Sequence, residues 1–268
     1  KALQNHHAPP ATAELRLETD QDRFALVWAL IEASDFARLC PFLHDWYIRQ
    51  PKIIRRKLKI ILGAPDVPRD EDLTSNEPRN TMFELVLGTI LSSNGAKVSF
   101  DTDADLVIET ESGPPLLIEC KRPFHEKTVG ENIRVARRRL STRLQRIPDA
   151  RGAIAISVAR SLNPAWNMLD THTQEDSSAA LAADQLELAD RYYAALDEPG
   201  EPRILVVLFH ILAPYEAERI MVQQQFASFN LPERPKADGK VVDELLHRLH
   251  SGEIERISVA STSDPAVP

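Results

Sequence analysis

Two short runs near the middle of the chain alternate between apolar and charged residues. Residues 105–110 read Asp-Leu-Val-Ile-Glu-Thr, and residues 116–121 read Leu-Leu-Ile-Glu-Cys-Lys after a Gly-Pro-Pro sequence. A period of two on either side of a turn sequence predicts two antiparallel strands joined by a hairpin. Because successive strand side chains point to opposite faces, Glu119 and Lys121 should share one face of the sheet, and Cys120 should lie on the other.

Helices are predicted on both sides of this hairpin. Apolar residues spaced by three and four predict three helices between residues 22 and 62, with Pro41 near the start of the second or as a break in it. The same spacing predicts further helices at residues 80–93, 131–147, 179–196, 214–229 and 241–250. A short strand is predicted at residues 97–100, and continuous apolar runs at 153–158 and 204–212 are typical of buried strands.

The segments between these elements suggest how the chain is organised. Residues 1–20 have no periodicity and predict a disordered lead, and the Pro-rich, acidic residues 63–78 predict a linker. We therefore expect a helical segment at 21–62, an α/β domain at 79–252 and a loose tail at 253–268. An early meander followed by helix crossovers to buried strands predicts an α/β fold with a mixed sheet flanked by helices.

Composition limits the classes of function. Apolar residues make up 43% of the chain, yet no run reaches the roughly 18 residues of a membrane span. We therefore expect no association with membranes. The two cysteines, Cys40 and Cys120, lie far apart, which favours reduced thiols in a cytoplasmic protein. The net charge of −8 argues against indiscriminate coating of nucleic acid, although an enzyme that acts on nucleic acid needs only a local basic surface.

The basic residues are unevenly distributed. Residues 51–62 carry Lys52, Arg55, Arg56, Lys57 and Lys59 without an acid, which indicates either a solvated helix face or contact with phosphate. In the predicted helix 131–147, six arginines flank the apolar stripe, and no acid follows Asn132 before Pro148. This second imbalance favours contact with phosphate.

Glu84 on the predicted helix 80–93, Asp105 at the start of one strand and Glu119-Cys120-Lys121 on the next occur in the element order αβββαβ. These residues in this order resemble the PD-(D/E)xK nuclease superfamily, over about residues 79–160. The resemblance implies a restriction-endonuclease-like core, here with additional N- and C-terminal helices. The chain departs from the family pattern at Ala104, where proline is common.

The resemblance also implies a role for each residue in a Mg²⁺-dependent phosphodiesterase, in which Mn²⁺ can substitute. Asp105, Glu119 and the backbone carbonyl of Cys120 would hold the metal, Glu84 would bind it directly or through water, and Lys121 would act on the attacking water or the developing charge. Asp103 is an alternative ligand that fits the pattern less well. The nucleic-acid-binding candidates are Arg122, Arg134, Arg137, Arg138, Arg139 and Arg143.

The resemblance favours DNA over RNA as the partner and leaves assembly into a homo-oligomer open. Two other interpretations compete with a nuclease. Glu119 and Lys121 could form a surface ion pair on an edge strand, which contributes at most about 1 kcal/mol to stability. Alternatively, the fold could serve as a catalytically inactive nucleic-acid-binding or assembly module.

Overall fold

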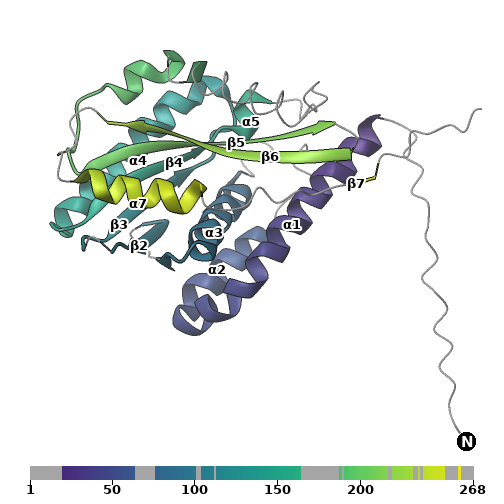
Figure 1. Ribbon diagram of the computed structural model, residues 1–268, viewed down its shortest axis with the longest axis horizontal. Helices are drawn as coiled ribbons and strands as arrows, with labels where there is room; N and C mark the ends of the chain where they lie inside the picture. Colours follow the sequence, from purple (N-terminus) through teal and green to yellow (C-terminus); the bar gives the residue numbers. More distant parts are fainter. Residues whose placement is uncertain are drawn as a thin grey trace, which may run out of the picture.

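A computed structural model shows a mixed β-sheet with helices packed against both faces (Figure 1). It describes residues 20–63, 76–100, 104–111, 113–163, 187–188, 190–216, 219–231, 235, 238–250 and 259–260. Residues 1–19 of the predicted lead, most of the predicted linker and most of the predicted tail lie outside these residues. The α/β class and the mixed sheet predicted from the sequence are confirmed.

The sheet has seven strands in the order β1-β2-β3-β4-β5-β6-β7. The strands are β1 (Lys97–Ser99), β2 (Leu106–Glu109), β3 (Leu116–Lys121), β4 (Arg151–Ser157), β5 (Ile204–Glu216), β6 (Arg219–Asn230) and β7 (Val259–Ala260). The pairs β1/β2 and β2/β3 are antiparallel, β3/β4 and β4/β5 are parallel, and β5/β6 and β6/β7 are antiparallel. The predicted hairpin is therefore β2–β3, at one side of the sheet.

The helices are α1 (Asp20–Arg49), α2 (Pro51–Ile61), α3 (Glu77–Ser93), α4 (Val129–Arg146), α5 (Ala159–Leu162) and α7 (Gly239–His250), with a 3₁₀ turn η2 (Glu126–Thr128). Residues 187–188 and 190–196 are also helical. The order α3-β1-β2-β3-α4-β4 matches the predicted order αβββαβ. Helix α3 begins before residue 80, the predicted start, because Pro78 fits the first turn of a helix, where no backbone N–H is needed.

Helix α1 is continuous through Pro41, so the prediction of two helices in this region is wrong. Proline in a helix interior removes one backbone hydrogen bond and is normally unfavourable. Here Leu39 and Trp46, on either side of Pro41, are both buried in the core. Burial of large side chains on both sides of the proline outweighs the local preference to end the helix.

The predicted helix at 214–229 is also wrong, because residues 214–216 end β5 and residues 219–229 form most of β6. The ladder between the two strands runs from Val206↔Asn230 to Glu216↔Ile220. In β6, Phe226 packs into the core on one face of the sheet, and Ala227 and Phe229 pack on the other. Both faces of this strand carry apolar residues, and this weakened the period-two signal in the sequence.

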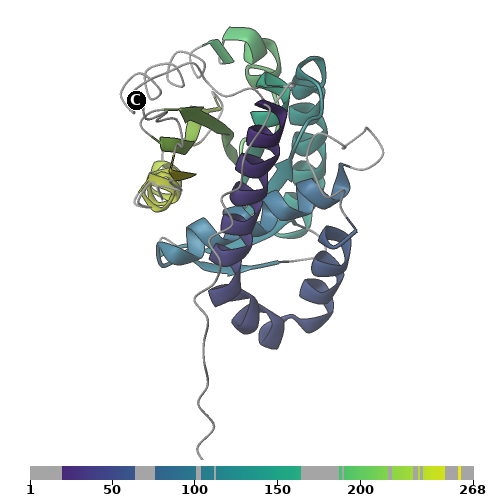
Figure 2. The same ribbon diagram turned by 90° about the vertical axis from the view of Figure 1, so that its right-hand side faces the viewer.

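Two hydrophobic layers lie on opposite faces of the sheet. One layer is formed with α4 and the helical residues 187–188 and 190–196, and the other with α1, α2, α3 and α7. Leu39, Trp46, Ile54 and Ile61 of the first two helices belong to the same core cluster as α3 and the sheet. Figures 1 and 2 show α2 turning back beside the end of α1. No helix in the described part of the chain has the length and apolar character needed to cross a membrane.

Candidate active site

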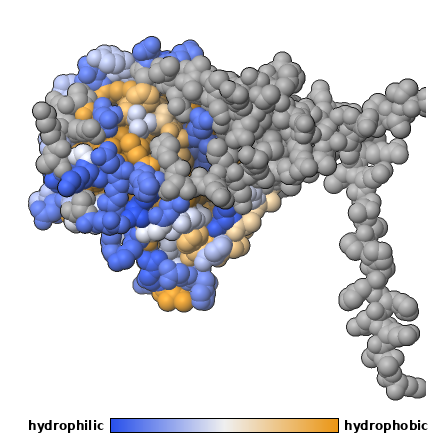
Figure 3. All heavy atoms as spheres, in the orientation of Figure 1, coloured by the Kyte–Doolittle hydropathy of each residue, from blue (hydrophilic) through white to orange (hydrophobic). Residues whose placement is uncertain are grey.

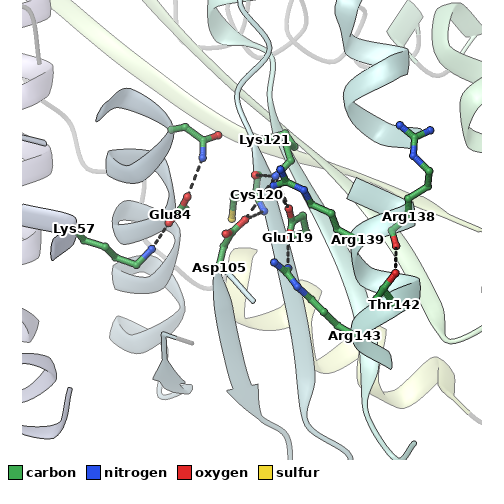
Figure 4. A network of polar contacts seen from close by, with 11 residues as sticks. Lys57, Glu84, Asp105, Glu119, Cys120, Lys121, Arg138, Arg139, Thr142 and Arg143 are labelled. Carbon is green, nitrogen blue, oxygen red and sulfur yellow. Dashed lines mark hydrogen bonds and ion pairs between the residues drawn. The ribbon is translucent and has the colours of Figure 1, made fainter. Parts of the chain in front are cut away.

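The residues singled out from the sequence lie together where β2 begins and β3 ends (Figure 4). The register of the hairpin pairs Leu106 with Ile118. Asp105, which directly precedes β2, therefore lies beside Glu119 of β3. The backbone N–H of Cys120 donates a hydrogen bond of 2.7 Å to Oδ2 of Asp105, which fixes the position of this carboxylate against the strand.

The ammonium of Lys121 lies among three oxygen atoms. Its Nζ is 2.5 Å from Oε1 of Glu119, 2.8 Å from the carbonyl oxygen of Cys120 and 3.9 Å from Oδ2 of Asp105. These are the three groups expected to hold a metal ion. The two carboxylates are thus close enough to share one cation, and Lys121 points towards both of them.

Glu119 is the most buried member of the cluster, with a fully enclosed side chain. In addition to Lys121, Nη1 of Arg139 donates to Oε1 of Glu119 at 3.2 Å, and Nη1 of Arg143 donates to Oε2. Both arginines belong to α4, which covers this face of the sheet. Because a buried carboxylate is costly unless it is paired, these contacts explain how Glu119 can be enclosed as an anion.

The two strand carboxyls respond in opposite ways to this environment. Burial acts to raise the pKa of Glu119, but the charges and hydrogen bonds of Lys121, Arg143 and Arg139 outweigh it, and the pKa is lowered. Burial and the charge of Glu119 raise the pKa of Asp105, against the opposing effects of Lys121 and the Cys120 N–H. Glu119 is therefore held ionised, whereas Asp105 takes up a proton more readily than an exposed aspartate.

Glu84 projects from α3 on the other side of Asp105 and is buried (Figure 4). Its Oε1 accepts a hydrogen bond of 2.8 Å from Nδ2 of Asn80, and its Oε2 pairs with Nζ of Lys57. Burial, and then the charge of Asp105, raise the pKa of Glu84 to about 7, although Lys57 and Lys121 act to lower it. Glu84 is therefore an enclosed neighbour of the cluster.

Lys57 was not selected as a site residue from the sequence. It lies on the buried face of α2 with Ile54 and Ile61, and its Nζ is 5.4 Å from the centre of the Phe100 ring. The spacing of three and four from two isoleucines was a signal that this lysine, unlike its basic neighbours, faces the protein. Helix α2 thus contributes a cation to the cluster from outside the αβββαβ core.

The arginines of α4 have different environments. Arg139 and Arg143 contact Glu119, as described above. Arg134 is 2.7 Å from Glu198, and Arg138 is 2.9 Å from Glu131, in ion pairs near the surface. Arg137 is buried and donates to the carbonyl oxygens of Leu196 and Glu198.

Two of the residues expected to contact nucleic acid therefore lie in the interior. Arg137 binds backbone carbonyls that follow a neighbouring helix. Arg122 is also buried, and its Nη1 donates to Oδ1 of Asn76 at 2.9 Å. In both cases the guanidinium binds groups of the protein, so these positions do not form a phosphate-binding surface. The acid-free stretch in the sequence did not reveal these distant partners.

Cys120 lies on the core face of β3, opposite to Glu119 and Lys121, as predicted. Its thiol is free and fully buried, and burial raises its pKa well above the usual value. The other cysteine, Cys40, is also a free thiol and is exposed. Cys120 contacts the cluster through its backbone, by its N–H and its carbonyl oxygen.

In the described part of the chain, no group of three or more His, Cys, Asp or Glu side chains forms a metal cage. The donor set is instead two carboxylates and one carbonyl, and Mg²⁺ is often bound by one or two carboxylates completed by water and substrate. The position of the Lys121 ammonium indicates that these oxygens fit one cation. Asp103, the alternative ligand, lies outside the described residues.

Comparison with protein-family models, with curated proteins and with solved structures finds no match to this chain. Its candidate function therefore depends on the side chains at the end of the β2–β3 hairpin.

Proposed function

We propose that the chain is a metal-dependent nuclease that hydrolyses phosphodiester bonds of nucleic acid, with DNA as the favoured substrate and Mg²⁺ or Mn²⁺ as the cofactor. The observation that carries this proposal is the position of the Lys121 ammonium among oxygens of Asp105, Glu119 and Cys120. An acid on one strand, an acid and a lysine on the next and a third acid on the preceding helix also support a PD-(D/E)xK-like site.

The residues of the chain would divide the work as follows. Asp105, Glu119 and the Cys120 carbonyl would hold the metal, and Glu84, whose pKa is raised by burial and then by the charge of Asp105, would bind it directly or through water. A bound divalent ion would activate a water molecule and neutralise charge on the scissile phosphate. Arg139 and Arg143 hold the carboxylate of Glu119 in place.

In the structure the Lys121 ammonium is held by oxygens of Glu119 and Cys120. Once it leaves these oxygens, it would be able to act on the substrate. A lysine at this position can orient the attacking water and stabilise negative charge as it develops on the phosphate. It remains close to both strand carboxylates because its backbone lies on β3. Its side chain is only 13% exposed, so little water competes for the ammonium.

One feature favours the alternative, an inactive binding or assembly module. Both carboxylate oxygens of Glu119 are already bound by cationic side chains, as in an ion cluster that only stabilises a fold. Such a cluster would hold the hairpin against α4 without any metal. The two interpretations differ in what happens when Lys121 is removed in the presence of metal.

Cleavage of plasmid and single-stranded DNA in Mg²⁺ or Mn²⁺ tests the proposal. We expect Lys121→Ala to lower the cleavage rate by about 100-fold or more, because one preorganised charge at a reacting phosphate contributes at this level. Lys97→Ala is the matched control, since Lys97 is an exposed lysine on β1 of the same sheet that pairs with Glu109. It should cleave like the wild type.

Circular dichroism should show that both variants retain the fold. Equal activity of Lys121→Ala and the wild type would refute the assigned role. An inactive wild type, tested with both metals and with RNA as well as DNA, would favour the binding module instead.

A further inference from the structure

The outer face of α2 carries four basic residues on one stripe. At 100° per residue, Lys52, Arg55, Arg56 and Lys59 fall within an arc of about 100°. All four are exposed, whereas Ile54, Lys57 and Ile61 on the opposite side of the helix are buried. We call these four exposed residues the α2 basic stripe.

The α2 basic stripe has no partner in the described part of the chain. None of its four residues forms an ion pair or hydrogen bond there. Most other exposed basic residues do have an acidic neighbour, as shown by Arg49 with Asp45 and by Arg138 with Glu131. The stripe is therefore a local concentration of positive charge on a chain with net charge −8.

The four like charges of the α2 basic stripe lower the stability of helix α2. Residues three and four apart on a helix are neighbours, so the stripe contains four like-charge pairs, each mildly destabilising. Helix α2 has no acid in its first turn, where negative charge would interact favourably with the helix dipole. An anionic partner on the outer face would remove this repulsion.

We propose that the α2 basic stripe binds the phosphate backbone of nucleic acid, in place of the buried Arg122 and Arg137. This inference rests on the proposed function and identifies a contact surface outside the catalytic cluster. The stripe extends about 10 Å from Lys52 to Lys59. One DNA strand places a phosphate about every 3.4 Å along the helix axis, so the stripe can follow about three phosphates.

The position of α2 supports this choice. Its inner face carries Lys57, which pairs with Glu84 at the edge of the catalytic cluster (Figure 4). The stripe lies on the other side of the same helix, about one helix diameter of 10 Å away. Nucleic acid that reaches the cluster can therefore contact the stripe with a flanking segment.

A nucleic acid fits the stripe better than a lipid surface does. A helix that lies on a membrane inserts its apolar face among the lipids. The apolar face of α2 is already packed in the core through Ile54 and Ile61. Figure 3 shows hydrophilic side chains over much of the lower part of the molecule, where Figure 1 places α1 and α2, beside hydrophobic ones at the tip and along one edge.

The test is binding of a fluorescent DNA duplex in EDTA, measured by polarisation over a range of salt concentrations. The variant Lys52→Gln/Arg55→Gln/Arg56→Gln/Lys59→Gln should bind at least tenfold more weakly at about 50 mM salt. The slope of log K against log salt should become shallower by about 3, because each phosphate contact contributes about 0.9. The α4 control, Arg134→Gln/Arg138→Gln, removes two arginines that already pair with Glu198 and Glu131 and tests the other candidate surface, so it should change both values much less.

Wild-type affinity and slope in the four-residue variant would overturn the proposal, as would an equal loss in the α4 control. Absence of DNA binding by the wild type would also overturn it. So would a variant that retains DNA binding but loses binding to vesicles containing phosphatidylserine. A thermal melt should show that the variant is at least as stable as the wild type, since like-charge pairs are removed.

This experiment separates the stripe from the nuclease proposal. A wild type that binds DNA through the stripe but does not cleave in Mg²⁺ or Mn²⁺ would retain the stripe and refute the nuclease. Cleavage with unchanged binding in the four-residue variant would refute the stripe and retain the nuclease.

Discussion

Replacing Lys57 with Met should destabilise the protein by an amount that grows with pH. Methionine keeps a long unbranched apolar side chain, so packing against Ile54 and Ile61 changes little. The substitution removes the ammonium that pairs with Glu84, and both side chains are buried. What remains is a buried carboxyl without its main counter-charge.

Protonation limits the cost of losing this charge. Burial, and then Asp105, already raise the pKa of Glu84 to about 7 in the wild type, and removal of Lys57 raises it further. Keeping the carboxyl protonated above pH 7 costs up to about 1.4 kcal/mol per pH unit. The expected loss from this source is therefore small at pH 6, at most about 1.4 kcal/mol at pH 8 and at most about 3 kcal/mol at pH 9.

The direction in which stability changes with pH follows from proton linkage. A carboxyl whose pKa is raised on folding binds its proton more tightly in the native state, so its contribution to stability falls as pH rises from the unfolded pKa. In the wild type this fall runs from the ordinary value of 4.5 to about 7. In the variant it continues above 7. Loss of the ammonium above the Phe100 ring adds about 0.5–1 kcal/mol that does not depend on pH.

Urea unfolding at pH 6, 7, 8 and 9 measures this effect. Lys59→Met is the matched control, because Lys59 is an exposed lysine on the same helix. In the double variant Lys57→Met/Glu84→Gln, the additional pH dependence should disappear. A loss that is the same at every pH, or an equal loss in Lys59→Met, would refute the reasoning.

Two further predictions concern packing and the interior arginines. Gly88→Ala should lower stability by about 1–3 kcal/mol in a thermal melt, because the added Cβ would lie 3.1 Å from the Phe100 ring and 3.2 Å from Leu106. Unchanged stability would show that these side chains can move aside. Arg137→Ala should lower stability by about 1–3 kcal/mol, because it leaves two backbone carbonyls without their donor, and should not change the salt dependence of DNA binding. A shallower salt slope at unchanged stability would assign Arg137 to the nucleic-acid surface after all.

The elements around the site could be predicted because their patterns are local. Strand β3 has the predicted bounds, and α3, α4 and β4 lie within a few residues of theirs. The errors arose where tertiary packing overrides a local signal. Helix α1 continues through Pro41 because large side chains on both sides are buried, and β6 was assigned as a helix because apolar residues occur on both of its faces.

Contacts between distant parts of the chain also limited what could be predicted of the candidate site. Strand alternation placed Glu119 and Lys121 on one face and Cys120 on the other, as the structure has them. The partners of the charged groups could not be predicted, because they come from distant parts of the chain. Lys57 reaches Glu84 from α2, and Arg137 binds carbonyls beyond residue 195.

The charge balance of the cluster has a consequence for how ligands would bind. Three carboxylates face four cationic side chains: Glu84, Asp105 and Glu119 against Lys57, Lys121, Arg139 and Arg143. A divalent ion that arrived alone would meet an excess of positive charge, whereas a phosphodiester brings the compensating negative charge with it. Metal and nucleic acid should therefore bind with positive cooperativity, and by thermodynamic reciprocity each strengthens the other by the same factor. The metal affinity of the free protein would then understate the affinity of the complex.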